Sequence, residues 1–385
     1  MEQNLLQSYR EELTQLEEKS NLRTLPEIVH RGRDVIRQGR QMLNLSSNDY
    51  LGLASELALR KAFLERLTPE CFLPSSSSSR LLTGNFTANG ELEELLCRLY
   101  KAESSLVFNS GYHMNTGILP AVSNSKTLIL ADKLVHASLI DGIRLSPAKF
   151  LRYRHNDCEH LESLLCRNHA DYERMIVVTE SIFSMDGDEA DLRRLVMLKK
   201  SYPNVMLYVD EAHAVGVRGE KGLGCAGEQG CIDGIDFLTG TFGKALASVG
   251  GYILCRRVIR DCLINKMRTL IFTTALPPVN LMWTRFVLER LEGFNDRRDY
   301  LKKISLYLKG QLAAKGYECP STSHIIPVMT GDSRKAISKA EDMQRKGFYL
   351  LPVRPPTVLE GTSRIRISLT ASVRTDEVER LISLL

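Results

Sequence analysis

The chain has 385 residues, and 43% of them are hydrophobic, which is enough to bury one large core and a second, smaller one. Its charged fraction of 25% is ordinary, so an intrinsically disordered chain is excluded. The net charge of +5 is small and the basic residues are interspersed with acidic ones, which argues against a nucleic-acid partner.

The sequence carries no sign of export or of a membrane anchor. It becomes strongly charged soon after Met-Glu-Gln-Asn, unlike a signal peptide, and no apolar run reaches the roughly 18 residues that cross a bilayer. We therefore expect a cytoplasmic protein with no membrane partner. The cysteines are odd in number, lack any C-x-x-C spacing, and are expected to be free thiols rather than disulfides or metal ligands. They are Cys71, Cys97, Cys158, Cys166, Cys225, Cys231, Cys255, Cys262 and Cys319.

The N-terminal part predicts an arm followed by a short strand. Leu6, Tyr9, Leu13 and Leu16 recur at helical spacing, so residues 4–20 are expected to form an amphipathic helix that packs on the body or on a partner subunit. A strand is expected over residues 42–46. We expect the arm to span residues 1–45.

Short apolar runs alternate with helical stretches from about residue 90 to 255, starting with a helix over residues 91–101. This alternation predicts a mostly parallel α/β sheet covered by helices, with its site at the carboxyl ends of the strands. The runs are Ser105–Phe108, Thr127–Ala131, Met175–Thr179, Val205–Val209, Phe237–Leu238 and Tyr252–Leu254. Polar residues follow four of them: Asp132, Glu180, Asp210 and Thr241.

The C-terminal part predicts a smaller α+β domain after a helical stretch over residues 279–315. Its expected elements are the strand His324–Met329, the helix Ser333–Lys346, the strand Arg364–Leu369 and the helix Thr375–Leu384. We expect the large domain to span residues 46–285 and the small one 286–385. The serine tract Ser75–Ser79 is predicted to be a flexible loop.

The strongest signal for chemistry is the segment Thr239–Ala247, which places Lys244 just past a buried strand among small residues. Desolvation there disfavours the ammonium form, and a neutral amine can attack an aldehyde to form a Schiff base. Small neighbours leave room for a planar ring. An exposed lysine in a glycine-rich turn is the alternative.

A second signal is Asp210-Glu211-Ala212-His213 at the end of the strand Val205–Val209. A carboxylate at a buried strand end needs a positive partner, and the protonated pyridine nitrogen of pyridoxal 5'-phosphate (PLP) is one. His213 is placed to reach the phenolic oxygen of that ring. A structural ion pair remains the alternative.

The motif D-E-A-H formed by residues 210–213 also occurs in helicase-type nucleic-acid motors. Such a motor needs a phosphate loop of the form G-x-x-x-x-G-K-[ST], and the sequence has none. The spacing from Gly240 to Lys244 is wrong, and Ala245 stands where a hydroxyl residue is required. A motor is therefore excluded.

Two further segments fit a PLP site. Asn109–Asn115 follows a strand and opens a helix, whose backbone N–H groups can hold a phosphate. His136 follows Asp132 at another strand end and can stack on a flat ring. Each alone is weak, since a strand–turn–helix with glycine is common and a histidine near a sheet edge is often a structural polar group.

Together these motifs resemble the α-oxoamine synthases, a branch of the fold type I PLP-dependent transferases, from about Ser46 to the C-terminus. The resemblance implies a mostly parallel sheet covered by helices, a smaller α+β C-terminal domain, and a homodimer with shared active sites. It implies PLP as the cofactor and no metal.

The resemblance also implies a role for each matching residue. Lys244 is implied to hold the cofactor, Asp210 to pair with its pyridinium nitrogen, and His136 to stack on its ring. Ser184, in Glu180–Asp188, and His213 are implied to lie near the ring oxygen. The implied phosphate contacts are Gly111, Tyr112, Thr241 and, from across the dimer interface, Thr273 and Thr274.

The substrate side is implied by matches outside the central sheet. Arg366 corresponds to the arginine that grips the amino-acid carboxylate, and Asn48 matches a site residue. Arg354 and Thr357 lie in a stretch that resembles the substrate-binding segment. Two departures from the family pattern concern acyl recognition: Ser75–Ser79 replaces a glycine-rich stretch, and Asn89 replaces a histidine.

Within the family the likeness is greatest to the branch that acts in biotin biosynthesis. It implies an acyltransferase that condenses L-alanine with a pimeloyl thioester, on CoA or acyl carrier protein, with loss of CO₂, to give 8-amino-7-oxononanoate. Glycine C-acetyltransferase and serine palmitoyltransferase are alternatives, because they share the catalytic residues. A catalytically silent protein on this fold is disfavoured because Lys244, Asp210 and His136 are all present.

Overall fold

The computed structural model describes residues 5–385, which divide by their contacts into two compact units. The large unit comprises residues 49–184 and 188–299, and the small unit comprises residues 5–48, 185–187 and 300–385. The domain limits expected at residues 45 and 285 remain a prediction.

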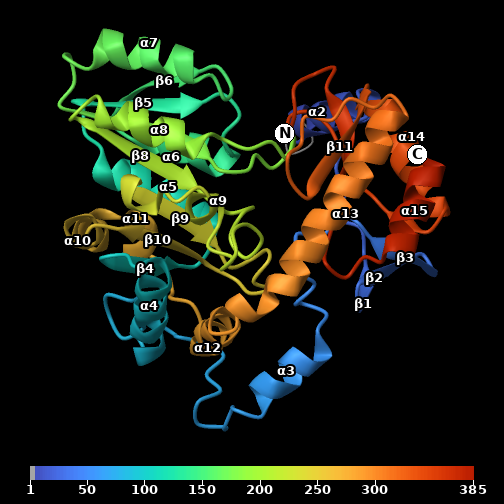
Figure 1. The fold of residues 1–385 in the computed structure, drawn as a ribbon, viewed down its shortest axis with the longest axis horizontal. Helices are drawn as coiled ribbons and strands as arrows, with labels where there is room; N and C mark the ends of the chain where they lie inside the picture. Colours follow the sequence, from blue (N-terminus) through green and yellow to red (C-terminus); the bar gives the residue numbers. More distant parts are fainter. Residues whose placement is uncertain (1–4) are drawn as a thin grey trace. The chain divides into compact units, whose positions relative to one another are not determined.

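A seven-stranded sheet forms the centre of the large unit (Figure 1). Its strands in spatial order are β4 (Ser104–Phe108), β10 (Gly251–Cys255), β9 (Phe237–Thr241), β8 (Val205–Asp210), β7 (Arg174–Glu180), β5 (Thr127–Asp132) and β6 (Lys149–Tyr153). The strands from β9 to β6 pair in parallel, whereas β10 runs antiparallel to both β4 and β9. The expected mostly parallel sheet is confirmed, and each of its six predicted strands is present.

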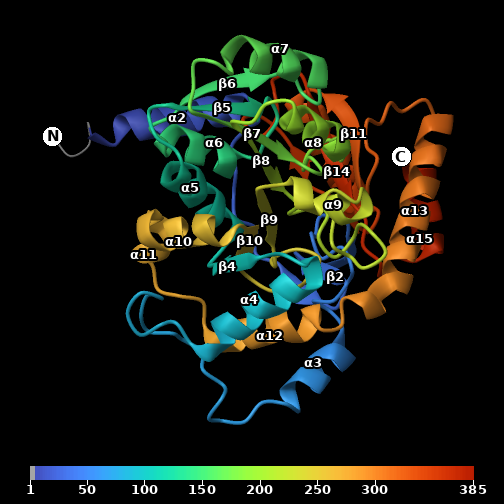
Figure 2. The same ribbon diagram turned by 60° about the vertical axis from the view of Figure 1, so that its left-hand side comes forward.

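Helices cover both faces of this sheet, with α5 and α6 on one face and α8 and α9 on the other (Figure 2). The α-helices assigned to this unit are α3 (Leu57–Leu64), α4 (Thr87–Tyr100), α5 (Gly111–Val122), α6 (Ala137–Leu145), α7 (Cys158–Asn168), α8 (Leu192–Lys200), α9 (Cys225–Glu228), α10 (Arg257–Lys266), α11 (Arg268–Ile271) and α12 (Pro278–Leu288). Short 3-10 turns lie at Ile232–Gly234 and Glu292–Phe294. Because both faces are covered, strands β4, β5 and β10 are buried at every position, and each fully buried Leu, Ile or Val contributes about 1.5–3 kcal/mol.

The small unit contains two sheets and four helices. One sheet joins β1 (Val29–Arg31), β2 (Asp34–Arg37), β3 (Arg40–Asn44) and β12 (Phe348–Tyr349). The other joins β11 (Ile325–Gly331), β14 (Ser363–Ser368) and β13 (Pro352–Val353). The helices are α2 (Gln7–Glu18), α13 (Asn295–Ala314, whose first turn belongs to the large unit), α14 (Ser333–Arg345) and α15 (Thr375–Leu384). The α+β character expected for the C-terminal part is confirmed.

The predicted N-terminal helix is present as α2, but it buries none of its residues within this chain. Leu6, Tyr9 and Leu13 are at least half exposed, and Leu16 is 39% exposed. The expected packing of this apolar stripe on the body of the chain is therefore not observed, and packing on a partner subunit remains a prediction.

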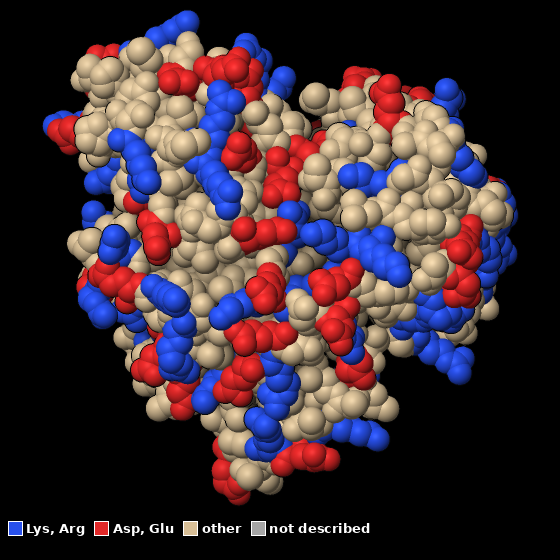
Figure 3. Space-filling model, viewed as in Figure 1, with Lys and Arg blue, Asp and Glu red and all other residues tan. Residues whose placement is uncertain are grey.

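Two surface properties agree with the composition. Acidic and basic side chains alternate over the face drawn in Figure 3, without a large patch of either sign. Among residues 5–385, the helices are all too short or too polar to span a bilayer.

Candidate active site

The carboxyl ends of four neighbouring strands bring polar side chains to one edge of the large unit's sheet. Glu180 pairs with Asp210 in the β7–β8 register, and Asp210 pairs with Thr239 in the β8–β9 register. Asp132 ends β5, and Thr241 ends β9. This is the edge where ligands bind in parallel α/β sheets.

Lys244 lies just past β9, half-buried, with its Nζ 3.0 Å from Nε2 of His213. The other ring nitrogen of His213, Nδ1, lies 2.6 Å from the hydroxyl of the fully buried Tyr50. The three side chains form a hydrogen-bonded row from the sheet edge into the core. The exposed-turn alternative for Lys244 is therefore disfavoured.

The loop that carries Lys244 is closed by its own backbone. Phe242 N–H donates to Gly250 O at 2.9 Å, and Gly250 has φ +115°, a conformation that favours glycine. The indole Nε1 of Trp283, the only tryptophan, donates to Ala247 O at 2.8 Å. These contacts fix the backbone on either side of Lys244, from which its side chain extends.

Asp210 is 5% exposed, and both of its carboxylate oxygens accept hydrogen bonds. Oδ2 accepts from Nδ2 of Asn115 at 2.8 Å, and Oδ1 accepts from Ala212 N–H at 2.9 Å. Asn115 is itself oriented by the Tyr208 hydroxyl, which donates to its Oδ1 at 2.7 Å. The carboxylate is therefore held in one orientation, as a partner for a protonated ring nitrogen must be.

His136 caps α6 at its N-terminus. Its Nδ1 lies 2.8 Å from Ser138 Oγ, and its backbone N–H donates to Glu180 Oε1 at 2.5 Å. His136 keeps an exposed surface, but partial burial of its ring lowers its pKa. The negative charge of Asp210 acts in the opposite direction and is outweighed. A largely neutral imidazole with an exposed face is suited to stacking on a flat aromatic ring.

Glu180 is buried beside Asp210 at the same edge. Burial, together with the charge of Asp210, raises the pKa of Glu180 well above its usual range. Burial therefore disfavours the charged form of Glu180 at this edge.

The N-terminus of α5 and the end of β9 approach each other closely. A Cβ added to Gly111, the first residue of α5, would lie 3.7 Å from Thr241 Oγ1, and one added to Gly251 would lie 3.1 Å from Gly111 N. Thr241 Oγ1 also accepts from Gly243 N–H at 3.2 Å. The Tyr112 hydroxyl donates a hydrogen bond to Asp141 and is thereby directed to that carboxylate. The backbone N–H of Tyr112 lies in the first turn of α5. Backbone donors at a helix N-terminus suit a phosphate.

Thr273 and Thr274 lie beside the same strand–turn–helix. Asn109 Nδ2 donates to Thr273 Oγ1 at 3.3 Å and to Thr274 O at 2.5 Å. Ser184 lies in the turn after β7, directly after the buried Phe183. The implied role of the two threonines at a partner's phosphate and that of Ser184 at the ring oxygen remain predictions.

The predicted substrate residues belong to the small unit. Arg366, on β14, donates to Asn48 Oδ1 at 3.3 Å and to Ser368 Oγ at 2.8 Å. Arg354 donates to the backbone oxygens of Ser20 and Leu22, and Arg23 donates to Thr357 Oγ1 at 2.7 Å. Arg354 and Thr357 are thus bound to the N-terminal segment. Their substrate roles and that of Arg366 remain predictions.

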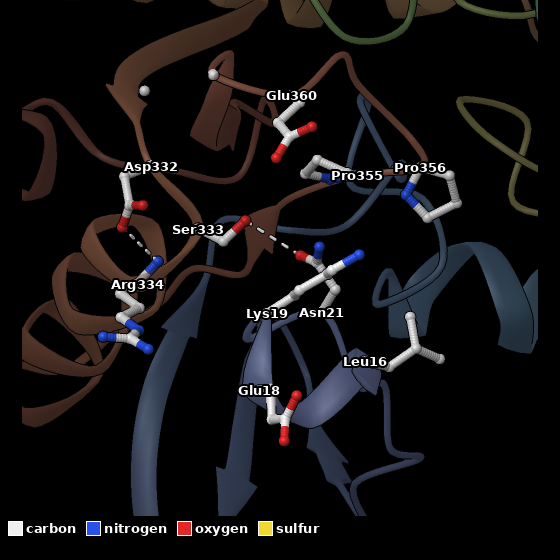
Figure 4. A pocket seen from close by; sticks show the side chains of 12 residues that line it. Leu16, Glu18, Lys19, Asn21, Asp332, Ser333, Arg334, Pro355, Pro356 and Glu360 are labelled. Atoms are coloured by element: carbon white, nitrogen blue, oxygen red, sulfur yellow. Dashed lines mark hydrogen bonds between the residues drawn. The ribbon is translucent and has the colours of Figure 1, made fainter. Parts of the chain in front are cut away.

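A cavity of about 720 Å³ lies in the small unit, beside the chain segment that carries Arg354 and Thr357 (Figure 4). Asp332 caps α14 there, and Ser333 Oγ donates to Asn21 Oδ1 at 3.0 Å. Pro355 and Pro356 line it, but none of the predicted site residues does.

The two departures from the family pattern are both held by hydrogen bonds. Ser76 is 5% exposed, and its Oγ donates to Ala275 O at 2.7 Å. Asn89 is 1% exposed within α4, and its Nδ2 donates to Phe86 O at 3.3 Å. Ser75–Ser79 is a loop, as predicted, but Ser76 anchors it next to Thr274.

The chain matches the aminotransferase class I and II family over residues 40–385. It belongs to this family. A relative from Neisseria meningitidis FAM18, provisionally named 8-amino-7-oxononanoate synthase, is 54% identical over 372 residues, covering 97% of this chain and 98% of the relative.

Two solved structures extend the comparison for this family member. A serine palmitoyltransferase from S. paucimobilis with bound PLP–myriocin aldimine has a TM-score of 0.90 and 27% identity, over 99% of this chain and 96% of the other. An 8-amino-7-oxononanoate synthase from Francisella tularensis has a TM-score of 0.76 and 26% identity, over 89% and 96%. The predicted α-oxoamine synthase relationship and the fold type I architecture are confirmed.

The site of this aminotransferase-family chain fits PLP on its own geometry. An amine, a buried carboxylate and an imidazole with an exposed face meet at one sheet edge, next to a helix N-terminus that lacks side-chain bulk at Gly111. In that order, these features suit the aldehyde, the ring nitrogen, the ring face and the phosphate of PLP.

Sequence reasoning missed the residues that hold these groups in place. Asn115 orients Asp210, and Tyr50 orients His213. Asn115 lies within Asn109–Asn115, which the sequence suggests only as a phosphate-binding segment. Each depends on a contact with a residue distant in sequence, which no local pattern reports.

Replacing Tyr50 with phenylalanine is expected to lower the free energy of unfolding by about 0.5–1.5 kcal/mol, since one buried hydrogen bond is lost. It should also lower kcat by roughly threefold to tenfold and shift the pH profile, because His213 loses its partner on Nδ1. Steady-state kinetics across pH measures this. Tyr100→Phe, which removes a 2.7 Å bond to Tyr252, is the control and should leave the pH profile unchanged. The same profile in both variants would contradict a role for Tyr50 at His213.

Proposed function

We propose that the chain catalyses the decarboxylative condensation of L-alanine with a pimeloyl thioester, on CoA or acyl carrier protein, to give 8-amino-7-oxononanoate in biotin biosynthesis. The chain is a PLP-dependent acyltransferase related to the α-oxoamine synthases. The single observation that carries the proposal is the meeting of Lys244 with His213, 3.0 Å apart, at the sheet edge that also holds Asp210. The 54% identity with the Neisseria relative supports the choice of substrates.

When bound, PLP supplies an electron sink for a negative charge that develops on the amino acid's α-carbon. Lys244 Nζ is the base that accepts the α-proton, a role typically contributing about 10²–10⁴-fold. His213 Nε2, within hydrogen-bond distance of Nζ, stabilises and orients that amine. Asp210 keeps the ring nitrogen protonated, and His136 fixes the plane of the ring.

Arg366 is proposed to bind the amino-acid carboxylate. Its guanidinium is half-buried on β14, oriented by Asn48 and Ser368. A guanidinium fork matches a carboxylate in two hydrogen bonds, so it fixes the α-carbon as well as binding it. Arg354 and Thr357, which are hydrogen-bonded to the segment between Ser20 and Arg23, are proposed to take part in substrate binding.

We also propose a homodimer with shared sites. The exposed apolar stripe of α2 and the position of Thr273 beside Asn109 support it. Light scattering coupled to gel filtration should give twice the chain mass, and α2 deletion should weaken the association.

A substrate panel tests the proposed function. Purified holoenzyme is given glycine, L-alanine or L-serine with acetyl, pimeloyl or palmitoyl thioesters, and thiol release is followed. Alanine with a pimeloyl thioester should give the highest kcat/KM, and pairing it with CoA or acyl carrier protein identifies the carrier. Highest turnover with glycine and acetyl-CoA, or with serine and palmitoyl-CoA, would replace the proposal with the corresponding sister activity. The TM-score of 0.90 with serine palmitoyltransferase makes the latter the second candidate.

A further inference from the structure

His155 bridges two carboxylates, those of Asp132 and Asp188. It follows β6, and its Nδ1 lies 2.9 Å from Asp132 Oδ1 while its Nε2 lies 2.7 Å from Asp188 Oδ2. The edge of Phe183 meets the imidazole at 4.4 Å between centroids, with the rings perpendicular. The side chain is 25% exposed, so most of its surface is enclosed by protein.

One carboxylate of this bridge holds the loop that leads to His136. Asp132 ends β5 and is fully buried, and its Oδ1 also accepts from Leu134 N–H at 2.8 Å. Its Oδ2 accepts from Asn156 N–H at 2.8 Å. Leu134 lies two residues before His136, so the direction of the chain at His136 depends on this carboxylate.

The other carboxylate belongs to the loop of Ser184. The backbone N–H of Phe183, the residue before Ser184, donates to Asp188 O at 3.0 Å. The Asp188 side chain accepts from Asn156 Nδ2 at 2.7 Å in addition to His155. The start and the end of this loop are therefore fixed to each other and, through Asp188, to His155.

The bridge requires a charged imidazole. A neutral imidazole has one N–H donor, whereas each ring nitrogen of His155 faces a carboxylate, so the doubly protonated ring satisfies both. Burial alone would lower the pKa of His155, but the hydrogen bonds and charges of Asp132 and Asp188 outweigh it and raise the pKa to about 10. These are the carboxylates that face the ring.

We propose that His155 is a positioning residue of the active site, whose imidazolium fixes both the loop of His136 and the loop of Ser184. The proposal rests on the proposed function, in which His136 contacts the cofactor ring, and on the predicted position of Ser184 at the ring oxygen. His155 touches no reacting atom. A displacement of about 1 Å at such contacts can lower the rate by about 10²-fold, so loss of the bridge should affect catalysis from outside the site.

Hydrogen exchange in the apoprotein tests the proposal without cofactor or substrate, so its failure is separable from that of the proposed function. His155→Ala should speed exchange in peptides covering both Asp132–His136 and Glu180–Ser184. Asp188→Ala, which removes the carboxylate that accepts from His155 Nε2, should speed exchange in the Glu180–Ser184 peptide alone. His169→Ala, an exposed histidine that caps α7 and bonds to Cys166 O, is the control and should change neither.

In the holoenzyme, His155→Ala should lower kcat by about 10²-fold and change the visible circular dichroism of the bound cofactor. Imidazole added to the buffer should restore both, because it can refill the partly exposed cavity and bridge the carboxylates again. Exchange that is unchanged in both peptides would overturn the proposal, even if kcat falls. If His155→Ala does not fold, Asp188→Ala decides: exchange at the wild-type rate in the Glu180–Ser184 peptide would overturn the proposal.

The pH dependence of stability gives a further check. Because the folded-state pKa of His155 is raised, its stabilising contribution is complete below about pH 6.5, the value for an unfolded histidine. The contribution decreases as the pH rises and is lost through about pH 10. The melting temperatures of wild type and His155→Ala should therefore converge as the pH approaches 10. A constant gap would contradict a charged bridge.

Discussion

Lys244→Ala is expected to lower kcat/KM with an amino acid and an acyl thioester by at least about 10⁴-fold. The substitution removes both the amine proposed to bind the cofactor covalently and the base proposed to accept the α-proton, and the second role alone is worth up to about 10⁴-fold.

Thiol release measured with saturating substrates gives the kinetic effect, and absorbance after dialysis gives the cofactor content. Lys221→Ala is the matched control, since Lys221 is an exposed lysine of the same unit paired with Glu292 at 3.4 Å. It should keep wild-type kinetics. A Lys244→Ala protein that retains PLP and turns over within tenfold of wild type would refute the assigned role.

Asp210→Asn has the second largest expected effect, a loss of about 10²–10³-fold in kcat. The amide cannot keep the ring nitrogen protonated, so the electron sink is weakened. Its NH₂ group also faces a donor whichever way it turns, either Asn115 Nδ2 or Ala212 N–H, which costs about 1–3 kcal/mol of stability.

Asp236→Asn is the control for Asp210→Asn. Asp236 precedes β9, at the opposite end of the strand, and accepts from Leu207 N–H at 2.7 Å and from Lys199 at 2.6 Å. Its substitution should lower the melting temperature but leave kcat and the cofactor absorbance unchanged. If Asp210→Asn, like Asp236→Asn, lowers only the melting temperature and leaves kcat unchanged, Asp210 is a structural residue only.

The buried part of the fold was predictable because burial dictates composition. Strands β5, β7 and β8 are enclosed on both faces, so they appear as continuous apolar runs. β6 was missed because it is the edge strand: four of its five residues are exposed, and its sequence KFLRY carries two charges. Strands β1 and β2 were also missed, because neither has more than one buried residue and so neither forms an apolar run.

The groups proposed to do the chemistry were predictable from the sequence, whereas their supports were not. Lys244 and Asp210 stand out because a charged residue at a buried strand end needs a reason. Tyr50 and His213 are 163 positions apart, and Asn115 and Asp210 are 95 positions apart, so only the folded chain pairs them. His155 shows the same limit, because a histidine after an exposed strand looks unremarkable until two carboxylates are found around it.

The resemblance named Arg354 and Thr357 without revealing what they contact. Both are bonded within the small unit, to the segment between Ser20 and Arg23. That contact requires the N-terminal arm to fold back on the C-terminal part of the chain. A match to a motif therefore identifies a residue, but its neighbours come only from the structure.

Reductive trapping of the cofactor tests the central claim most directly. Holoenzyme is treated with borohydride, digested, and mapped by mass spectrometry. We expect one modified peptide, with the reduced cofactor mass on the Nζ of Lys244, and none in Lys244→Ala. A cofactor mass on any other side chain, or a holoenzyme whose cofactor washes away after reduction, would contradict the account.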